Sequence, residues 1–319
     1  MSIRAGIDLG GTKIQAIVVD EQNQVLGQAR RPTPTEGGPP DVAAAMTGAV
    51  QEAAAAASIK PSSLTGVGVG SPGSIDAAAG TVSQARNLPG WDGTFGLAAV
   101  LEKDFNVPIK IGNDVAVETR AEAVLGAGKQ HRSFLGVAWG TGVGGGLILD
   151  GKQWLGHGDA AEIGHMVVKL GGRRCGCGRR GCMEAYAGRA AMEAHARKLV
   201  EKGYRTDLFT IMEERGRDRL TSGVWARALK HEDQLATELI DQAVEALGAG
   251  IASAINLLDV AAVVISGGLG TRFGDPMADR IKQAMLPHLF NDQRPPEVLA
   301  STLGDLGGAI GAALLVESA

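Results

Sequence analysis

Residues 3–31 read IRAGIDLGGTKIQAIVVDEQNQVLGQARR, and this stretch predicts three short β-strands. A glycine turn separates the first two strands, and a polar turn separates the second strand from the third. Residues 133–155, SFLGVAWGTGVGGGLILDGKQWL, repeat this plan, with Asp150 in the place of Asp20. The repeat predicts a chain made of two halves that share one design.

Helices and strands alternate after the first of these stretches, which indicates an α/β fold. An alanine-rich helix is expected after Asp41, its predicted N-cap, followed by a strand that ends before Pro72. Residues 185–249 predict several helices, and residues 260–270, VAAVVISGGLG, predict a buried strand that ends in glycines. The chain then closes with a helix rich in small residues.

The composition excludes several classes of function. With 319 residues, 45% of them hydrophobic, the chain can bury a large core and most simply forms two domains. A net charge of −4 and an aromatic content of 4% argue against a nucleic-acid interface. The N-terminus has no signal-peptide pattern, and Asn256 and Asp259 interrupt the longest apolar stretch. We therefore expect a cytoplasmic protein whose partner is a small molecule, with no nucleic acid and no membrane.

All three cysteines of the chain, Cys175, Cys177 and Cys182, lie within eight positions. Their number is odd, and the first two are too close in sequence for an unstrained disulfide. A structural Zn²⁺ site needs four nitrogen or sulfur ligands. The nearest histidine upstream is His165, so we predict that it is the fourth ligand. Incidental thiols in a reduced chain, or a zinc knuckle for nucleic acid, are the alternatives.

Glycine-rich loops occur several times, but they do not match the common nucleotide-binding motifs. Three GxGxxG matches lack the strand, turn and helix of a Rossmann fold, and no Walker A sequence is present. Glycine turns between strands can still present N–H groups to phosphate, as DLGGTK (8–13) and GTGVGGG (140–146) would. In the first turn, Thr12 adds a hydroxyl, Lys13 a positive charge and Asp8 a carboxylate that can hold hydrated Mg²⁺. Ordinary hairpin turns are the alternative.

Six segments, in this order, carry a resemblance to a known family: DLGGTK, GND, GTGVGGG, AAEIGH, CGCGRRGCMEAY and SGGLG. From Ile3 to the final helix the chain resembles the ROK family of repressors and sugar kinases, within the actin-like superfamily. The resemblance implies an α/β fold of two actin-like (RNase H-like) domains around an interdomain cleft. The smaller domain would comprise residues 1–115 and 306–319. The larger, residues 116–305, would contain the zinc-binding loop and a helical insertion.

The resemblance also implies roles for individual residues. Asp114 would be the general base, and the residues expected to contact the sugar are Asn113, Asp114, Glu162, His165 and Glu184. The residues expected to hold ATP and its magnesium are Asp8, Gly10, Gly11, Thr12, Lys13, Gly140, Thr141 and Gly142, with Gly267 and Gly268 beside the adenosine. The implied zinc ligands are His165, Cys175, Cys177 and Cys182. Without the resemblance, Asp114 is more simply the N-cap of the helix that it opens.

The implied activity is ATP-dependent phosphorylation of glucose at O6, with ATP, Mg²⁺ and structural Zn²⁺ as cofactors. The alternative substrates are N-acetylmannosamine, N-acetylglucosamine, mannose, fructose and allose, and polyphosphate is an alternative donor. A repressor of the family would need a DNA-binding module before Ile3, and a silent sugar sensor would not need Asp114 with both glycine loops. A zinc hydrolase is not expected, because four protein ligands leave no open position for water. The family favours homodimers and homotetramers.

One position departs from the family pattern. Glycine is common in the family where this chain has Ala161, immediately before Glu162. If the backbone requires a positive φ there, alanine would shift the loop and alter sugar specificity.

Overall fold

The structure is a computed structural model that describes residues 2–85 and 87–316. It divides into two compact units: unit 1 is Met1–Gly126, Gln153–Ala160 and Asp305–Ala319, and unit 2 is Ala127–Lys152 and Ala161–Gly304. The domain limit expected at residue 115 falls inside a continuous helix, α3 (Asp114–Val124), and unit 1 continues beyond this helix to Gly126.

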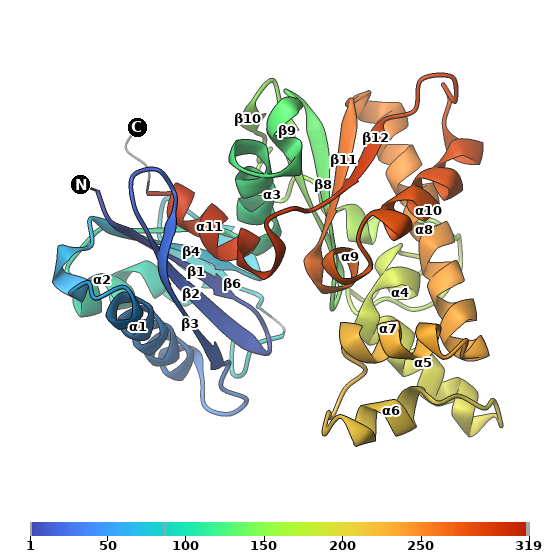
Figure 1. The fold of residues 1–319 in the computed structure, drawn as a ribbon, viewed down its shortest axis with the longest axis horizontal. Coiled ribbons are helices and arrows are strands. Elements are labelled where there is room, and N and C mark those ends of the chain that lie inside the picture. The colour runs from blue at the N-terminus through green and yellow to red at the C-terminus, as the bar shows by residue number, and fades with distance from the viewer. Residues whose placement is uncertain (1, 86, 317–319) are drawn as a thin grey trace. The chain divides into compact units, whose positions relative to one another are not determined.

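Unit 1 contains a five-stranded sheet of order β3-β2-β1-β4-β7 (Figure 1). Its strands are β1 (Arg4–Leu9), β2 (Lys13–Val19), β3 (Val25–Pro32), β4 (Gly66–Ser71) and β7 (Ile109–Asn113). β1 runs antiparallel to β2 and parallel to β4, and β4 runs parallel to β7. A separate pair, β5 (Ser74–Asp76) and β6 (Thr81–Ser83), is antiparallel.

The second five-stranded sheet repeats the first, with the order β10-β9-β8-β11-β12. Its strands are β8 (Phe134–Trp139), β9 (Val143–Leu149), β10 (Lys152–Gln153), β11 (Ala262–Ser266) and β12 (Glu297–Ala300). β8 is antiparallel to β9 and parallel to β11, and β11 is parallel to β12. The equivalent orders and directions confirm the predicted α/β fold of two halves with one design.

Helices cover both faces of the sheet in unit 1 (Figure 1). They are α1 (Pro39–Ala56), α2 (Leu97–Phe105), α3 and α11 (Gly307–Leu314). Side chains alternate along β1, so Ile7 lies in the core with Met46 of α1 while Gly6 faces α11. A Cβ atom at Gly6 or at Gly68 of β4 would overlap backbone oxygens of α11. These two glycines therefore allow α11 to contact the sheet backbone to backbone.

Unit 2 is richer in helices. They are α4 (Glu184–Ala187), α5 (Arg189–Glu201), α6 (Leu208–Glu214), α7 (Ser222–Lys230), α8 (Gln234–Leu258), α9 (Gly267–Phe273) and α10 (Asp275–Met285). The prediction of several helices in residues 185–249 is thus confirmed. Unit 2 also contains the short 3₁₀ turns η2 (Ala127–Gln130), η3 (Ile163–His165) and η4 (Leu286–His288), whereas η1 (Pro61–Ser63) belongs to unit 1 and η5 (Gly304–Leu306) spans the boundary. Within the described ranges, no helix has the length and apolar character needed to cross a bilayer.

Two local predictions were wrong. The N-cap of α1 is Gly38, and Asp41 lies at the third helical position, where its Oδ2 accepts a hydrogen bond of 2.9 Å from the Gly38 N–H. The helix begins earlier than predicted because two prolines suit its first positions, where no N–H donor is required. The glycines after β11 form the first turn of α9 and do not extend the strand, since Gly267 has a φ of +77°.

Candidate functional site

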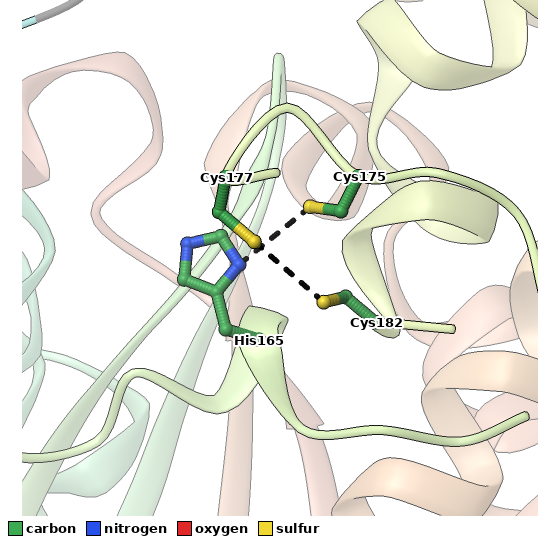
Figure 2. A group of neighbouring side chains, drawn as sticks. All are labelled: His165, Cys175, Cys177 and Cys182. Atoms are coloured by element: carbon green, nitrogen blue, oxygen red, sulfur yellow. Dashed lines mark hydrogen bonds between the residues drawn. The ribbon is translucent and has the colours of Figure 1, made fainter. Parts of the chain in front are cut away.

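The four side chains predicted to bind zinc converge in unit 2 (Figure 2). One ligand atom from each of His165, Cys175, Cys177 and Cys182 lies within 4.8 Å of all the others. The Sγ atoms of Cys177 and Cys182 are 3.8 Å apart, and Cys175 Sγ is 3.8 Å from His165 Nδ1. A tetrahedral site with metal–sulfur bonds of about 2.3 Å has sulfur–sulfur edges of about 3.8 Å. The cluster therefore has the donors and spacing of a structural zinc site.

Two short backbone bridges bring these ligands together. Arg174 pairs with Arg180, which folds the cysteine loop into a narrow hairpin, and Val167 pairs with Cys182. Gly178, with a φ of +91°, forms the turn of the hairpin, and its N–H donates to the Cys175 carbonyl at 3.0 Å. The first bridge places Cys175 and Cys177 on one hairpin, and the second carries Cys182 back to the segment after His165.

The two ring nitrogens of His165 face different partners. Nδ1 faces the thiols, whereas Nε2 is 3.9 Å from Oε2 of Glu162. Nδ1 would therefore hold the metal, and Nε2 would carry the hydrogen that can be donated to a carboxylate or a sugar hydroxyl. This arrangement fits the double role predicted for His165.

The thiols are reduced, and their surroundings affect them differently. Burial raises the pKa of Cys175 to about 12 and also raises the pKa of Cys182. Burial acts in the same direction on Cys177, but hydrogen bonds from the Arg179 backbone and from the other two thiols outweigh it and lower its pKa. Zinc binds thiolates, so metal uptake would displace protons and would weaken as the pH falls.

Glu184 connects the cysteine cluster to the second glycine loop. Its Oε1 accepts a hydrogen bond from the Cys175 thiol at 3.6 Å, and its Oε2 accepts one from the Val143 N–H at 3.0 Å. A Cβ atom at Gly142 would overlap Oε2, so the glycine makes room for this carboxylate. Glu184 is thus held in position from both sides, and part of its hydrogen-bonding capacity is already used. These contacts were not predictable from the sequence.

The second glycine loop, Gly140–Gly142, joins β8 to β9 and is anchored by the start of α5. The N–H of Gly140 donates to the carbonyl of Gly142 at 3.0 Å. The N–H groups of Arg189 and Ala190 donate to the carbonyls of Gly140 and Thr141 at 3.1 and 3.0 Å. The start of α5 therefore holds the backbone of the loop in place through two carbonyl oxygens.

Gly267 and Gly268 lie near the same loop. β11 is parallel to β8, with Ser266 paired to Ala138, so both strands end at one edge of the sheet. Gly268 therefore lies next to Gly140, Gly267 lies against the backbone of Trp139, and α9 packs against β8. The structure thus brings together the residues of unit 2 that are predicted to bind the phosphates and the adenosine of ATP.

The first glycine loop, Gly10–Gly11, joins β1 to β2 in unit 1. The Gly10 N–H donates to the Lys13 carbonyl at 2.9 Å, and Thr33 Oγ1 donates to the Gly10 carbonyl at 2.6 Å. Thr33 follows β3 and therefore fixes the loop from a neighbouring strand. Sequence inspection did not single out Thr33, because no local pattern links it to this turn.

A group of charged residues surrounds this loop. Asp305 lies 3.7 Å from Lys13 Nζ and 3.7 Å from Arg30 Nη1. Burial raises the pKa of Asp8; Lys13 and Arg30 oppose this increase and Asp305 adds to it. A cation beside Asp8 would favour its charged form, which fits the expected magnesium role. Arg30 and Asp305 were not predicted, since only the tertiary fold brings them to the loop.

Asn113 and Asp114 lie at the start of α3, at the sheet edge that also carries the first glycine loop. Asp8 of β1 pairs with Gly70 of β4, and Gly70 pairs with Gly112 of β7, so the three parallel strands end together. Asn113 is the N-cap, and its Oδ1 accepts from two backbone N–H groups at 3.1 Å. The alternative that Asp114 is the N-cap is therefore wrong. Asp114 occupies the first helical position, where a negative charge is favourable.

Ala161 has a φ of +65°, which is the left-handed region in which glycine is favoured. The backbone at this position thus takes the positive φ that the family's glycine would allow, and it does so with an alanine. The loop before Glu162 keeps its conformation at the cost of local strain.

We expect Ala161→Gly to stabilise the protein by up to about 1.6 kcal/mol. Relief of the left-handed strain raises the free energy of unfolding by about 1–2 kcal/mol. The greater freedom of glycine in the unfolded chain lowers it by about 0.4–1 kcal/mol. Denaturant unfolding measures the change, with Ala160→Gly as the control outside the left-handed region, expected to be destabilising. A destabilised Ala161→Gly protein would contradict the strain that we assign here.

The predicted residues form two groups, one in each unit. Unit 1 contains Asp8, Gly10, Gly11, Thr12, Lys13, Asn113 and Asp114. Unit 2 contains Gly140, Thr141, Gly142, Glu162, His165, Cys175, Cys177, Cys182, Glu184, Gly267 and Gly268. The convergence of the four zinc ligands is confirmed, whereas the roles of the remaining residues in binding sugar and ATP stay predictions.

Comparison with known proteins shows which proteins this chain is similar to. The ROK family model matches residues 4–319. A glucokinase from Streptomyces coelicolor is 32% identical over 317 residues, covering 98% of this chain and 97% of that protein. A crystal structure of a ROK family glucokinase from Streptomyces griseus with glucose and AMPPNP has a TM-score of 0.84 and 30% identity, covering 98% and 99%. The N-acetylgalactosamine kinase AgaK from Shewanella sp. strain ANA-3 is 31% identical over 319 residues, covering 97% and 95%.

Proposed function

We propose that this chain, which belongs to the ROK family, transfers the γ-phosphoryl group of ATP to O6 of glucose. The observation that carries the proposal is the pair of glycine turns at equivalent places in two equivalent sheets, after β1 and after β8. Such turns can bind phosphate through backbone N–H groups. The glucokinase relatives, similar over nearly their whole length, support a sugar kinase and suggest glucose.

Asp114 is the proposed general base. Its carboxylate takes the proton of the sugar O6 hydroxyl while O6 forms a bond to the γ-phosphorus and the bond from that phosphorus to the bridging oxygen breaks, releasing ADP. Lys13 and the loop N–H groups other than those of Gly10 and Gly140 offset the phosphate charge. Asp8 would hold hydrated Mg²⁺, whose charge lowers the barrier further.

The sugar is proposed to meet three side chains of unit 2: Glu162, His165 and Glu184. Carboxylates accept hydrogen bonds from sugar hydroxyls, and the outward-facing Nε2 of His165 can donate one. The site formed by His165 and the three cysteines would hold Zn²⁺, which would fix this imidazole and leave no coordination position for a reacting water. Zinc would therefore stabilise the fold without taking part in the reaction.

The substrate is tested by ADP release from Mg-ATP across hexoses and N-acetylhexosamines, using protein whose zinc content has been measured. A strong preference for glucose is expected. N-acetylhexosamines are the second candidate, because the N-acetylgalactosamine kinase is about as similar as the glucokinases. Turnover of an N-acetylated sugar alone would keep the kinase and replace its substrate. No turnover with any sugar or with polyphosphate would overturn the proposal in favour of a sugar sensor.

A further inference from the structure

Arg189 lies at the first position of α5, directly against the second glycine loop. Its backbone N–H donates to the Gly140 carbonyl at 3.1 Å, and its Nη2 donates to Thr141 Oγ1 at 2.8 Å. Its Nη1 donates to the Leu220 carbonyl at 2.9 Å. The guanidinium is therefore fixed by two neutral acceptors, one of which belongs to the loop.

The Arg189 guanidinium forms no ion pair with a carboxylate of the described residues. Among residues 2–85 and 87–316, no Asp or Glu oxygen lies within ion-pair distance of its guanidinium. Glu193, one turn further along α5, instead accepts from Arg197 at 2.7 Å and from the Leu220 N–H at 2.9 Å. Burial lowers the pKa of Arg189, the negative charge of Glu193 opposes this decrease, and the positive charge of Arg219 adds to it. The net decrease reflects the cost of a half-buried cation that has no ion-pair partner. An anion bound at the loop would relieve that cost.

The hydrogen bond from Arg189 also determines what the Thr141 hydroxyl can do. A hydroxyl has one hydrogen, and this oxygen already accepts from Nη2. Its hydrogen therefore points away from the guanidinium. Thr141 is exposed, so this hydrogen is available to a ligand in the loop.

We propose that Arg189 is a positioning residue for the nucleotide, acting through Thr141. It orients the threonine hydroxyl as a donor to a phosphate oxygen and supplies the loop with a positive charge that a phosphate can balance. This inference rests on the proposed function, because it requires ATP phosphates at the Gly140–Gly142 loop. It assigns a role to a side chain that no glycine-loop motif includes.

The test is a double-mutant cycle measured by calorimetric binding of Mg-AMPPNP, which does not depend on the identity of the sugar. Arg189→Met and Thr141→Val should each raise Kd about 10-fold, the lower end of the range for hydrogen bonds involving a charged group. The double variant should be no more than about 3-fold weaker than either single variant, because the two residues act together. Arg189→Lys should restore part of the affinity. Steady-state kinetics should show a raised KM for ATP and an unchanged KM for the sugar.

Arg197→Met is the matched control, because it removes an arginine two turns along the same helix, where Glu193 and the Phe209 ring are its partners. It should bind Mg-AMPPNP like the wild type. Wild-type affinity in Arg189→Met, or additive losses in the double variant, would overturn the inference alone. If the unmodified protein bound no Mg-AMPPNP, the proposed function would fail with it. Should Arg189→Met not fold, Arg189→Lys replaces it in the cycle and should lose several-fold in affinity.

Discussion

Asp114→Asn is expected to lower kcat by about 100-fold to 10,000-fold, the range typical of general-base catalysis. Asparagine has nearly the same shape, and its Oδ1 can still accept the 2.9 Å hydrogen bond from the Val115 N–H. The start of α3 should therefore survive the change, because Asn113 provides the cap. What is lost is the proton acceptor. The measurement is steady-state turnover on the sugar found active, with folding and zinc content verified.

Asp41→Asn is the matched control for this variant. Asp41 is also a carboxylate in the first turn of a helix in unit 1, and its Oδ2 accepts from the Gly38 N–H at 2.9 Å. Its replacement should cost some stability and leave turnover unchanged. If Asp114→Asn, folded and containing zinc, kept near-normal kcat, the assignment of Asp114 as the base would fail.

Cys177→Ala is expected to reduce bound metal from about one zinc per chain to a small fraction, because three ligands remain of the four that a structural site needs. Structural zinc contributes about 10–16 kcal/mol in small peptides, although a large unit supported by its own core depends on it less. We expect a clear fall in Tm and in the yield of folded protein. The KM for sugar should rise, because Glu184 is a proposed sugar ligand and its Oε1 lies 3.6 Å from Sγ of Cys175 in the cluster. Metal analysis and thermal unfolding are the measurements.

Gly176→Ala provides the control within the same loop. A Cβ atom at Gly176 would meet nothing within 4 Å, so this variant alters the loop without removing a ligand. It should retain its zinc and its Tm. A Cys177→Ala protein with full metal content and wild-type kinetics would contradict the metal site.

The sequence predicted those parts of the fold that depend on local patterns. The meander of residues 3–31 and its repeat led to two sheets with one strand order, and the closing helix rich in small residues is α11. The two wrong predictions concern where a helix begins and where a strand ends. The residue type of Asp41 suits an N-cap, but two prolines move the start of the helix toward the N-terminus, to Gly38. The convergence of the zinc ligands followed from their number and chemistry, which are local properties.

Contacts between distant segments were not predictable in this way. Thr33, Asp305 and Arg189 each meet a glycine loop only because the tertiary structure brings their segments together. No periodicity or motif connects them to the residues that they contact. For the same reason, the sequence suggested that Glu184 binds sugar but not that the Val143 N–H already occupies one of its oxygens.

The position of α11 has a consequence for synthesis of the protein on the ribosome. α11 packs against β1, β4 and α3, yet it consists of residues 307–314, nearly three hundred residues after β1 emerges. Unit 1 therefore cannot complete its core until residues 307–314 have left the exit tunnel, whereas nearly all of unit 2 has emerged by then. The first half to be translated should be the last to acquire its native packing, and until then the sheet surface around Gly6 and Gly68 remains uncovered and accessible to chaperones.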